Sequence, residues 1–164
     1  MLLAPPNVSA AFLSADESEI LVNDIERVFS RFNQGDPEPF ILSSHPLVYQ
    51  YAGGQEAFEN QARKAIQAFK DGHMRLTTED IGAPTELIVV EGGEVCFVPR
   101  TVRLKSNNRQ ARQTTFVVAI RDVSSQWRYV DGSPFRTNPE LLFTMLPFLS
   151  KDVVLPPNTI EVLE

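Results

Sequence analysis

The sequence is poor in the residues from which many functional sites are built. Its 164 residues include one cysteine, Cys96, and two histidines. A lone cysteine cannot form a disulfide within the chain, and two distant histidines without an acidic cluster beside them lack metal-ligand spacing. Phosphate-binding, dinucleotide-binding and nucleophile-elbow motifs are also missing. The sequence therefore predicts no metal site and no cofactor.

Charge and hydropathy exclude further classes of protein. The formal net charge of -6 argues against nucleic acid or an anionic membrane as a partner, because phosphates bind clustered lysine and arginine. No apolar run approaches the roughly 20 residues that span a bilayer. The first residues lack the basic start of a signal peptide. We expect a cytoplasmic protein, in which the basic residues of 103–112 form a solvated loop or dock an acidic protein surface.

Length and patterning predict a single domain over residues 14–149, preceded by an arm at 1–13. Residues 150–164 are typical of a tail or of an added extended segment. Ser14 and Glu17 form a capping box before a helix whose apolar residues recur at helical spacing. Those residues are Leu21, Ile25, Val28, Phe29 and Phe32. "HPLVYQY" at 45–51 predicts an extended stretch, and a second striped helix follows at 55–72.

The hydrophobic period changes to two from His73 onward. Strands are predicted near 73–80, 85–91, 94–105, 112–121 and 126–131, with turn-rich breaks such as "EGGE" and "DVSS". Short breaks imply an antiparallel meander with one polar face and one face that receives the two helices. "NPELLFTML" predicts a last helix with Asn138 as its cap and Pro139 in first position. The predicted fold class is therefore α+β.

Two helices followed by a meander that ends in "WRYVDGS" resemble the NTF2-like superfamily, which includes nuclear transport factor 2, ketosteroid isomerase and the SnoaL-like cyclases. The resemblance covers about residues 14–135 and is carried by "FSRFNQGD" and "FVVAIRDVSSQWRYVDGS". It implies a cone-shaped, cystatin-like fold, in which a curved antiparallel sheet wraps around N-terminal helices and leaves a cavity. It also implies a homodimer packed through the outer face of the sheet. Relatives differ in chemistry, so the motifs indicate a fold more than a function.

Alternation places Trp127, Tyr129 and Asp131 on one face of the last strand, where they are candidates to bind a ligand. Asp131 either caps the turn at Gly132, which is the favoured interpretation, or serves as an acceptor or base at the rim of a cavity. Tyr49 and Tyr51 alternate in the extended stretch. They are candidates for the cavity opening, although simple sheet packing is favoured.

Arg100 is the charged residue on a strand face that otherwise carries Cys96, Val98, Val102 and Leu104. Either Pro99 marks a bulge that turns Arg100 outward, or the guanidinium faces inward and needs a carboxylate or an anionic ligand. We favour the bulge, because a long strand in a curved sheet needs one. If Arg100 faces inward, Asp131 is its expected partner. The pair, with Tyr129, then forms the polar end of an apolar pocket.

The leading functional hypothesis is noncatalytic binding of a small apolar ligand or of a protein partner. The alternative is a small isomerase, dehydratase or cyclase that acts on a hydrophobic substrate. His45, otherwise typical of a surface histidine, or Asp131 would move the proton, and Arg100 would stabilise negative charge. The catalytic sets of the relatives cannot be transferred, since the first helix has no tyrosine and only one histidine is suitably placed. Cys96 has apolar neighbours and is expected to be inert.

Overall fold

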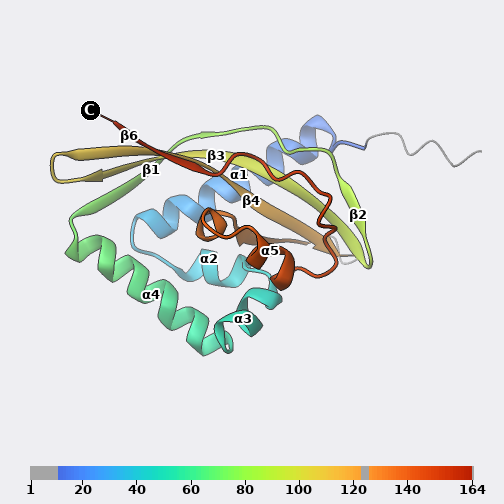
Figure 1. Cartoon of the computed structure of the whole chain (residues 1–164), viewed down its shortest axis with the longest axis horizontal. Helices are drawn as coiled ribbons and strands as arrows, with labels where there is room; N and C mark the ends of the chain where they lie inside the picture. The colour runs from blue at the N-terminus through green and yellow to red at the C-terminus, as the bar shows by residue number, and fades with distance from the viewer. Residues whose placement is uncertain (1–10, 123–125, 164) are drawn as a thin grey trace, which may run out of the picture.

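The structure, a computed structural model, describes residues 11–122 and 126–163. Most of the predicted arm and part of the predicted "DVSS" turn lie outside these residues. The fold is α+β, with helices first and a sheet after them (Figure 1). The helices are α1 (Ala15–Asn33), α2 (Glu38–Ser43), α3 (Pro46–Ala52), α4 (Gln55–Asp71), the 3-10 turn η1 (Ser133–Phe135) and α5 (Glu140–Met145). The strands are β1 (Met74–Ile81), β2 (Ile88–Val90), β3 (Gly93–Ser106), β4 (Arg109–Asp122), β5 (Trp127–Asp131) and β6 (Thr159–Leu163).

α1 begins where the capping pattern predicts. Ser14 Oγ accepts a hydrogen bond from the Glu17 N–H at 3.2 Å, which satisfies a free donor of the first turn. Most of the predicted apolar stripe packs on one face of the sheet, whereas Phe32 packs against the cluster of α2 and α4. The buried members of this cluster are Leu21, Ile25, Val28 and Phe29 of α1 with Cys96, Val98, Val117, Ala119 and Tyr129 of the sheet. A local sequence signal thus fixes both the start of α1 and the side that it buries.

Residues 46–52 form the helix α3, so the predicted extended stretch is wrong. Pro46 takes the first helical position after His45, whose Nδ1 accepts a hydrogen bond from the Leu47 N–H at 3.2 Å. Gly53 ends the helix with a φ of 97°, a left-handed conformation that suits glycine. A short segment with a proline and several aromatic or branched residues fits a strand as well as a helix. Because α3 is a helix, its tyrosines do not alternate on a strand face.

All pairs among the named strands are antiparallel, and the open sheet has the order β1-β3-β4-β5. In a meander, each strand pairs with the next one along the chain. Here β1 pairs with β3 and not with β2, and the three-residue β2 also pairs with the start of β3, so the predicted meander is wrong in this respect. β3 and β4 pair without a shift from Gly93 to Ser106, and the register shift lies on β1 between Thr78 and Asp80. The predicted bulge at Pro99 is therefore also wrong.

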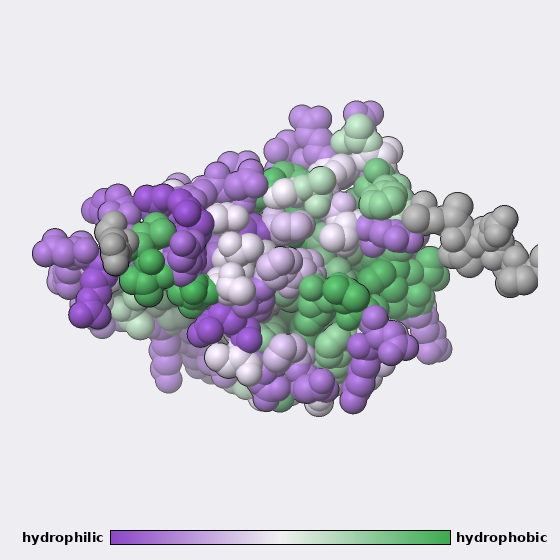
Figure 2. All heavy atoms as spheres, turned by 45° about the horizontal axis from the view of Figure 1, so that its top comes forward, coloured by the Kyte–Doolittle hydropathy of each residue, from purple (hydrophilic) through white to green (hydrophobic). Residues whose placement is uncertain are grey.

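The long β3–β4 hairpin has two differently covered halves. In the inner half (residues 93–100 and 115–122), α1 covers one face, and α5 with the segment after it covers the other. The second face is therefore apolar here, although the sequence predicted it to be polar. In the outer half (residues 101–106 and 109–114), Arg103 and Arg112 remain partly exposed and bind Glu79 of β1. Figure 2 shows hydrophilic side chains gathered at the end where this hairpin turns.

α4 packs on other helices more than on the sheet. Its Phe58 and Ala62 are buried with Ile41 of α2 in a separate cluster. Phe40 of α2 joins this cluster to α1, because its ring centroid lies 5.7 Å from that of Phe29 and 5.9 Å from that of Phe58. The aromatic contacts hold the helices as a layer beneath the sheet (Figure 1).

The C-terminal residues return to the sheet. α5 begins at Glu140 with Pro139 as its cap, one residue later than predicted from Asn138. The segment at 159–163, for which the sequence allowed a tail or an added strand, forms β6 and pairs with β4 in the outer half. Across the described ranges, we find no helix with the length and apolar character needed to cross a membrane.

Candidate functional site

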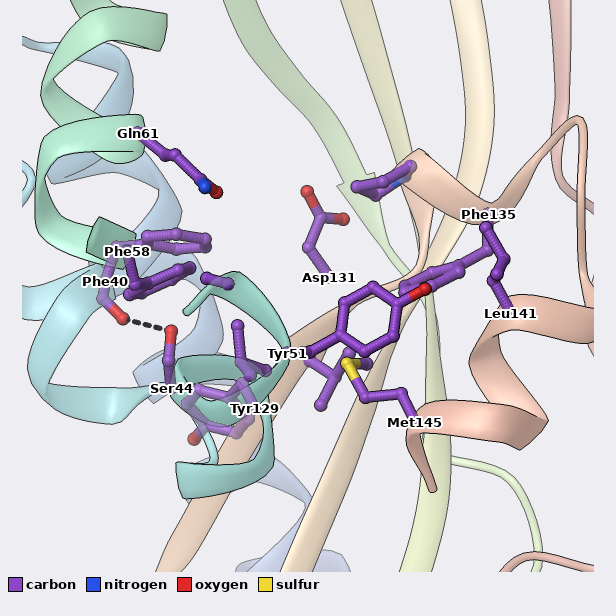
Figure 3. Close-up of a pocket in the computed structure, with 14 residues that line it drawn as sticks. Phe40, Ser44, Tyr51, Phe58, Gln61, Tyr129, Asp131, Phe135, Leu141 and Met145 are labelled. Atoms are coloured by element: carbon purple, nitrogen blue, oxygen red, sulfur yellow. Dashed lines mark hydrogen bonds between the residues drawn. The ribbon is translucent and has the colours of Figure 1, made fainter. Parts of the chain in front are cut away.

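A cavity of about 430 Å³ opens beside β5, at the edge of the inner half of the sheet. α2, α3 and α4 form one wall, and η1 with α5 forms the other (Figure 3). The apolar wall residues are Phe40, Val48, Ala52, Phe58, Val130, Pro134, Phe135, Leu141 and Met145. The polar ones are Ser44, Tyr51, Gln61, Tyr129 and Asp131. We call this space the β5 cavity.

Asp131 is the one residue with a carboxylate among the described residues that line the cavity. Figure 3 shows its side chain pointing into the space between α4 and Phe135. The Ser133 N–H donates to Oδ1 at 3.1 Å, and the Ser133 hydroxyl donates to Oδ2 at 2.8 Å. The Asp131 side chain is 21% exposed. Asp131 therefore caps the turn, as the favoured interpretation predicted, and it also lines the cavity, while a role as acceptor or base for a ligand stays a prediction.

A close approach at Gly132 holds this turn in place. The Gly132 N–H donates to the carbonyl oxygen of Phe116 at 2.9 Å. A Cβ atom on Gly132 would lie 2.6 Å from that oxygen and 2.7 Å from the Phe116 ring, closer than van der Waals contact allows. A larger residue would push the turn away from β4. Glycine at this position therefore fixes where Asp131 and Ser133 meet.

Arg100 lies beside Asp131 on the α1 face of the sheet, so its outward orientation, which the sequence favoured, is wrong. Its side chain is 6% exposed, and Nη2 lies 3.6 Å from Oδ1 of Asp131. The guanidinium also stacks over the Phe29 ring at 3.8 Å from the centroid. Burial lowers the pKa of Arg100, and the charge of Asp131 opposes that shift. The expected partner is present, although Arg100 is not one of the described residues that line the β5 cavity.

Tyr129 contributes its ring to the cavity, while its hydroxyl points away from Asp131 (Figure 3). That hydroxyl donates to Oδ2 of Asp24 on α1 at 2.5 Å. Burial, followed by this hydrogen bond, raises the pKa of Tyr129. Tyr51 extends from α3 into the cavity wall and is 54% exposed. Asp131 therefore lines the cavity and pairs with Arg100, which does not line it, and the Tyr129 hydroxyl takes no part in this pair.

His45 lies elsewhere. It caps α3 and lines two smaller cavities together with Ile120 and Asp122. Burial lowers the pKa of His45, Arg128 lowers it further, and Asp122 opposes both effects. The two candidates for proton transfer, His45 and Asp131, therefore line separate cavities.

Tyr49, Trp127 and Cys96 contact other parts of the protein and do not line the β5 cavity. The Tyr49 hydroxyl donates to the carbonyl of Ile41, and its ring lies 5.3 Å from that of Phe58, behind the cavity wall. Trp127 packs beneath the guanidinium of Arg121 at 4.6 Å. Burial raises the pKa of the Cys96 thiol to about 12, so the thiol stays protonated at neutral pH and agrees with the expectation of an inert residue.

Most of the cavity wall was not predicted from the sequence. Helical periodicity indicated that Phe58 and Met145 face inward, but it carried no signal that they border an open space. Phe40 and Ser44 follow Pro37 and Pro39, which stand at the start of α2, and the Ser44 hydroxyl donates to the Phe40 carbonyl at 2.7 Å. Gln61 lies on the polar side of α4 and had no distinguishing signal.

The site offers a largely apolar surface, a few polar groups and one carboxylate. Within the described residues, no group of three His, Cys, Asp or Glu side chains is arranged to hold a metal ion. Comparisons with protein-family models, with curated proteins and with solved structures give no match to this chain. The functional argument therefore depends on the geometry of the site.

Proposed function

We propose that the chain is an NTF2-like domain that binds a small, largely apolar molecule in the β5 cavity. The observation that carries the proposal is the cavity itself: about 430 Å³ with aromatic and aliphatic walls and one carboxylate. Ligand sites typically enclose roughly 300–1,000 Å³ and combine apolar walls with a few placed polar groups. Both the size and the composition of this cavity meet that description.

The NTF2-like assignment is supported by the layout of the elements. α1 packs on one face of an antiparallel sheet, and the last strand of the expected core, β5, ends in an aspartate beside a cavity. The expected homodimer stays a prediction. α5 and the segment after it already cover the second face of the inner half, so such a dimer would have to use the outer half.

Proton-transfer catalysis receives less support from the same geometry. A general acid or base needs hydrogen-bond reach to the reacting atom and a second group that stabilises the developing charge. Asp131 is engaged by Ser133 and Arg100, and His45 lines other cavities. The described wall of the β5 cavity therefore brings one carboxylate to a bound molecule without a facing cation or histidine.

Fluorescence titration with N-phenyl-1-naphthylamine, a neutral two-ring probe, tests this proposal. The probe should bind the wild-type protein saturably, with the rise in emission that follows transfer into an apolar site. Gln61 is exposed on α4, and its side chain points toward the cavity (Figure 3). Gln61→Trp should fill the opening with an indole ring and weaken the affinity by about tenfold or more.

Gln67→Trp is the matched control, because it makes the same substitution at an exposed glutamine of the same helix. Gln67 donates to Asp71 at 2.8 Å and does not line the cavity. This variant should bind the probe as the wild type does. Equal affinities of the wild type and Gln61→Trp would show that the probe binds elsewhere. Absence of saturable binding to the wild type would contradict the proposal.

A further inference from the structure

Asp131, which lines the β5 cavity, is paired with the buried Arg100. We infer that the cavity selects a neutral molecule with a hydrogen-bond donor, such as an alcohol or an amide N–H, over cations and anions of the same shape. This inference rests on the proposed binding function and adds the chemical class of the ligand.

Asp131 has acceptor capacity left for such a donor. Ser133 donates to both of its oxygens, and Arg100 Nη2 lies 3.6 Å from Oδ1. A carboxylate has about four lone-pair positions, so these three neighbours leave at least one unoccupied. The carboxylate points into the cavity (Figure 3). A donor on the ligand would therefore meet an ionised acceptor in an apolar surrounding, where such hydrogen bonds are strong.

An anionic ligand would meet no compensating charge. None of the described wall residues is Lys, Arg or His, and an anion would lie beside the like charge of Asp131. Arg100 is the cation that pairs with Asp131, but it is 6% exposed and stacked on Phe29. The guanidinium therefore cannot reach a ligand without leaving both Phe29 and Asp131.

A cationic ligand would meet a negative charge that is already compensated. Asp131 would attract an ammonium group, but the Arg100 guanidinium, whose Nη2 lies 3.6 Å from the same carboxylate, would repel it. The ammonium would also lose much of its hydration between apolar walls. The attraction of an ion to a charge pair is weaker than its attraction to a lone carboxylate, so it does not offset this loss. A neutral donor loses far less hydration.

Four probes with one biphenyl skeleton test the inference by displacing N-phenyl-1-naphthylamine from the wild-type protein at pH 7. They are 4-methylbiphenyl, biphenyl-4-ylmethanol, biphenyl-4-ylmethylammonium and biphenyl-4-carboxylate. The alcohol should bind about tenfold tighter than the hydrocarbon, as expected for one hydrogen bond to a charged acceptor. Both ions should bind more weakly than the alcohol. An ion that binds more tightly than the alcohol, or an alcohol no better than the hydrocarbon, overturns the inference.

Arg100→Met gives the sharpest test, because it keeps a long flexible side chain over Phe29 and removes the charge. Asp131 then becomes an uncompensated carboxylate, and the ratio of ammonium affinity to alcohol affinity should rise by about tenfold or more. An unchanged ratio in a protein that melts cooperatively overturns the inference.

Asp131→Asn is a second variant of nearly the same shape, to be used if Arg100→Met does not fold. It replaces the ionised acceptor by a neutral amide, and the advantage of the alcohol over the hydrocarbon should fall to about threefold or less. A persistent tenfold advantage would contradict the role of Asp131.

The two proposals fail in different ways. If neither N-phenyl-1-naphthylamine nor any biphenyl binds the wild-type protein, the proposed function itself is wrong. If the probes bind and Gln61→Trp weakens them, but the order of the four biphenyls differs from the expected one, only the ligand class is wrong.

Discussion

Arg100 and Arg103 lie three residues apart on β3 and represent the two halves of the β3–β4 hairpin. Arg100, in the inner half, is 6% exposed, stacks on Phe29 and has Asp131 as its ion-pair partner. Arg103, in the outer half, is 32% exposed and shares Glu79 with Arg112. The same residue type is thus a buried cation in one half and a solvated one in the other. The elements that cover the strand decide its role, and the β5 cavity lies beside the covered half.

The largest difference between the halves should appear when a core ring is removed. Phe116 is fully buried in the inner half and contacts Phe97 in a T-shaped arrangement at 5.6 Å. Phe116→Ala should lower the free energy of unfolding by about 3–5 kcal/mol, because the surroundings cannot fill the space. Thr114→Ala, on the same strand face in the outer half, should lower it by about 1 kcal/mol or less. Urea denaturation measures both, and equal losses would contradict the division of the hairpin.

Removal of the partner of Arg100 should have the next largest effect. Asp131→Ala leaves a buried guanidinium without its ion-pair partner. The free energy of unfolding should fall by about 3 kcal/mol. This value is at the low end for a broken buried ion pair, because the Asp131 side chain is partly exposed. The double variant Arg100→Met/Asp131→Ala should recover part of this loss, because the stranded charge is gone. If the double variant is no more stable than Asp131→Ala, the unpaired charge of Arg100 is not the cause of the lost stability.

The smallest effect should come from the outer half, where hydrogen bonds from Arg103 and then Arg112 lower the pKa of Glu79. A folded-state pKa below the ordinary value of 4.5 means that Glu79 stabilises the fold above that pH. This contribution is lost as the pH falls through the folded-state pKa. Glu79→Gln should therefore reduce stability at pH 7 less than Asp131→Ala does and should lose its effect in acid.

Salt sharpens the same comparison. Exposed ion pairs are screened at high ionic strength, whereas buried ones are screened much less. The effect of Glu79→Gln on urea denaturation should shrink in about 1 M NaCl, while that of Asp131→Ala should persist. If salt does not change the effect of Glu79→Gln, the ion pairs of Glu79 with Arg103 and Arg112 behave as buried pairs, which would contradict the comparison.

Features encoded by neighbouring residues were predicted well. The cap at Ser14, the buried stripe of α1 and the strands after His73 follow from side-chain period and capping chemistry, which act within a few residues. The segment at 46–52 was predicted wrongly, because its pattern is too short to separate a strand from a helix. Arg100 was left with two orientations, and the favoured one was wrong, because alternation gives the face of a residue only when the register is known.

The sequence by itself determined an α+β chain, a helix capped at Ser14, an antiparallel sheet and the shared strand face of Tyr129 and Asp131. These features depend on local hydrogen bonds and on the spacing of apolar residues. Tertiary structure alone decided that Arg100 is buried against Phe29, that β1 lies beside β3 and that Gln61 and Leu141 face each other across an open space. Such positions depend on how distant elements pack, and a cavity is volume that this packing leaves unfilled, for which no residue pattern exists.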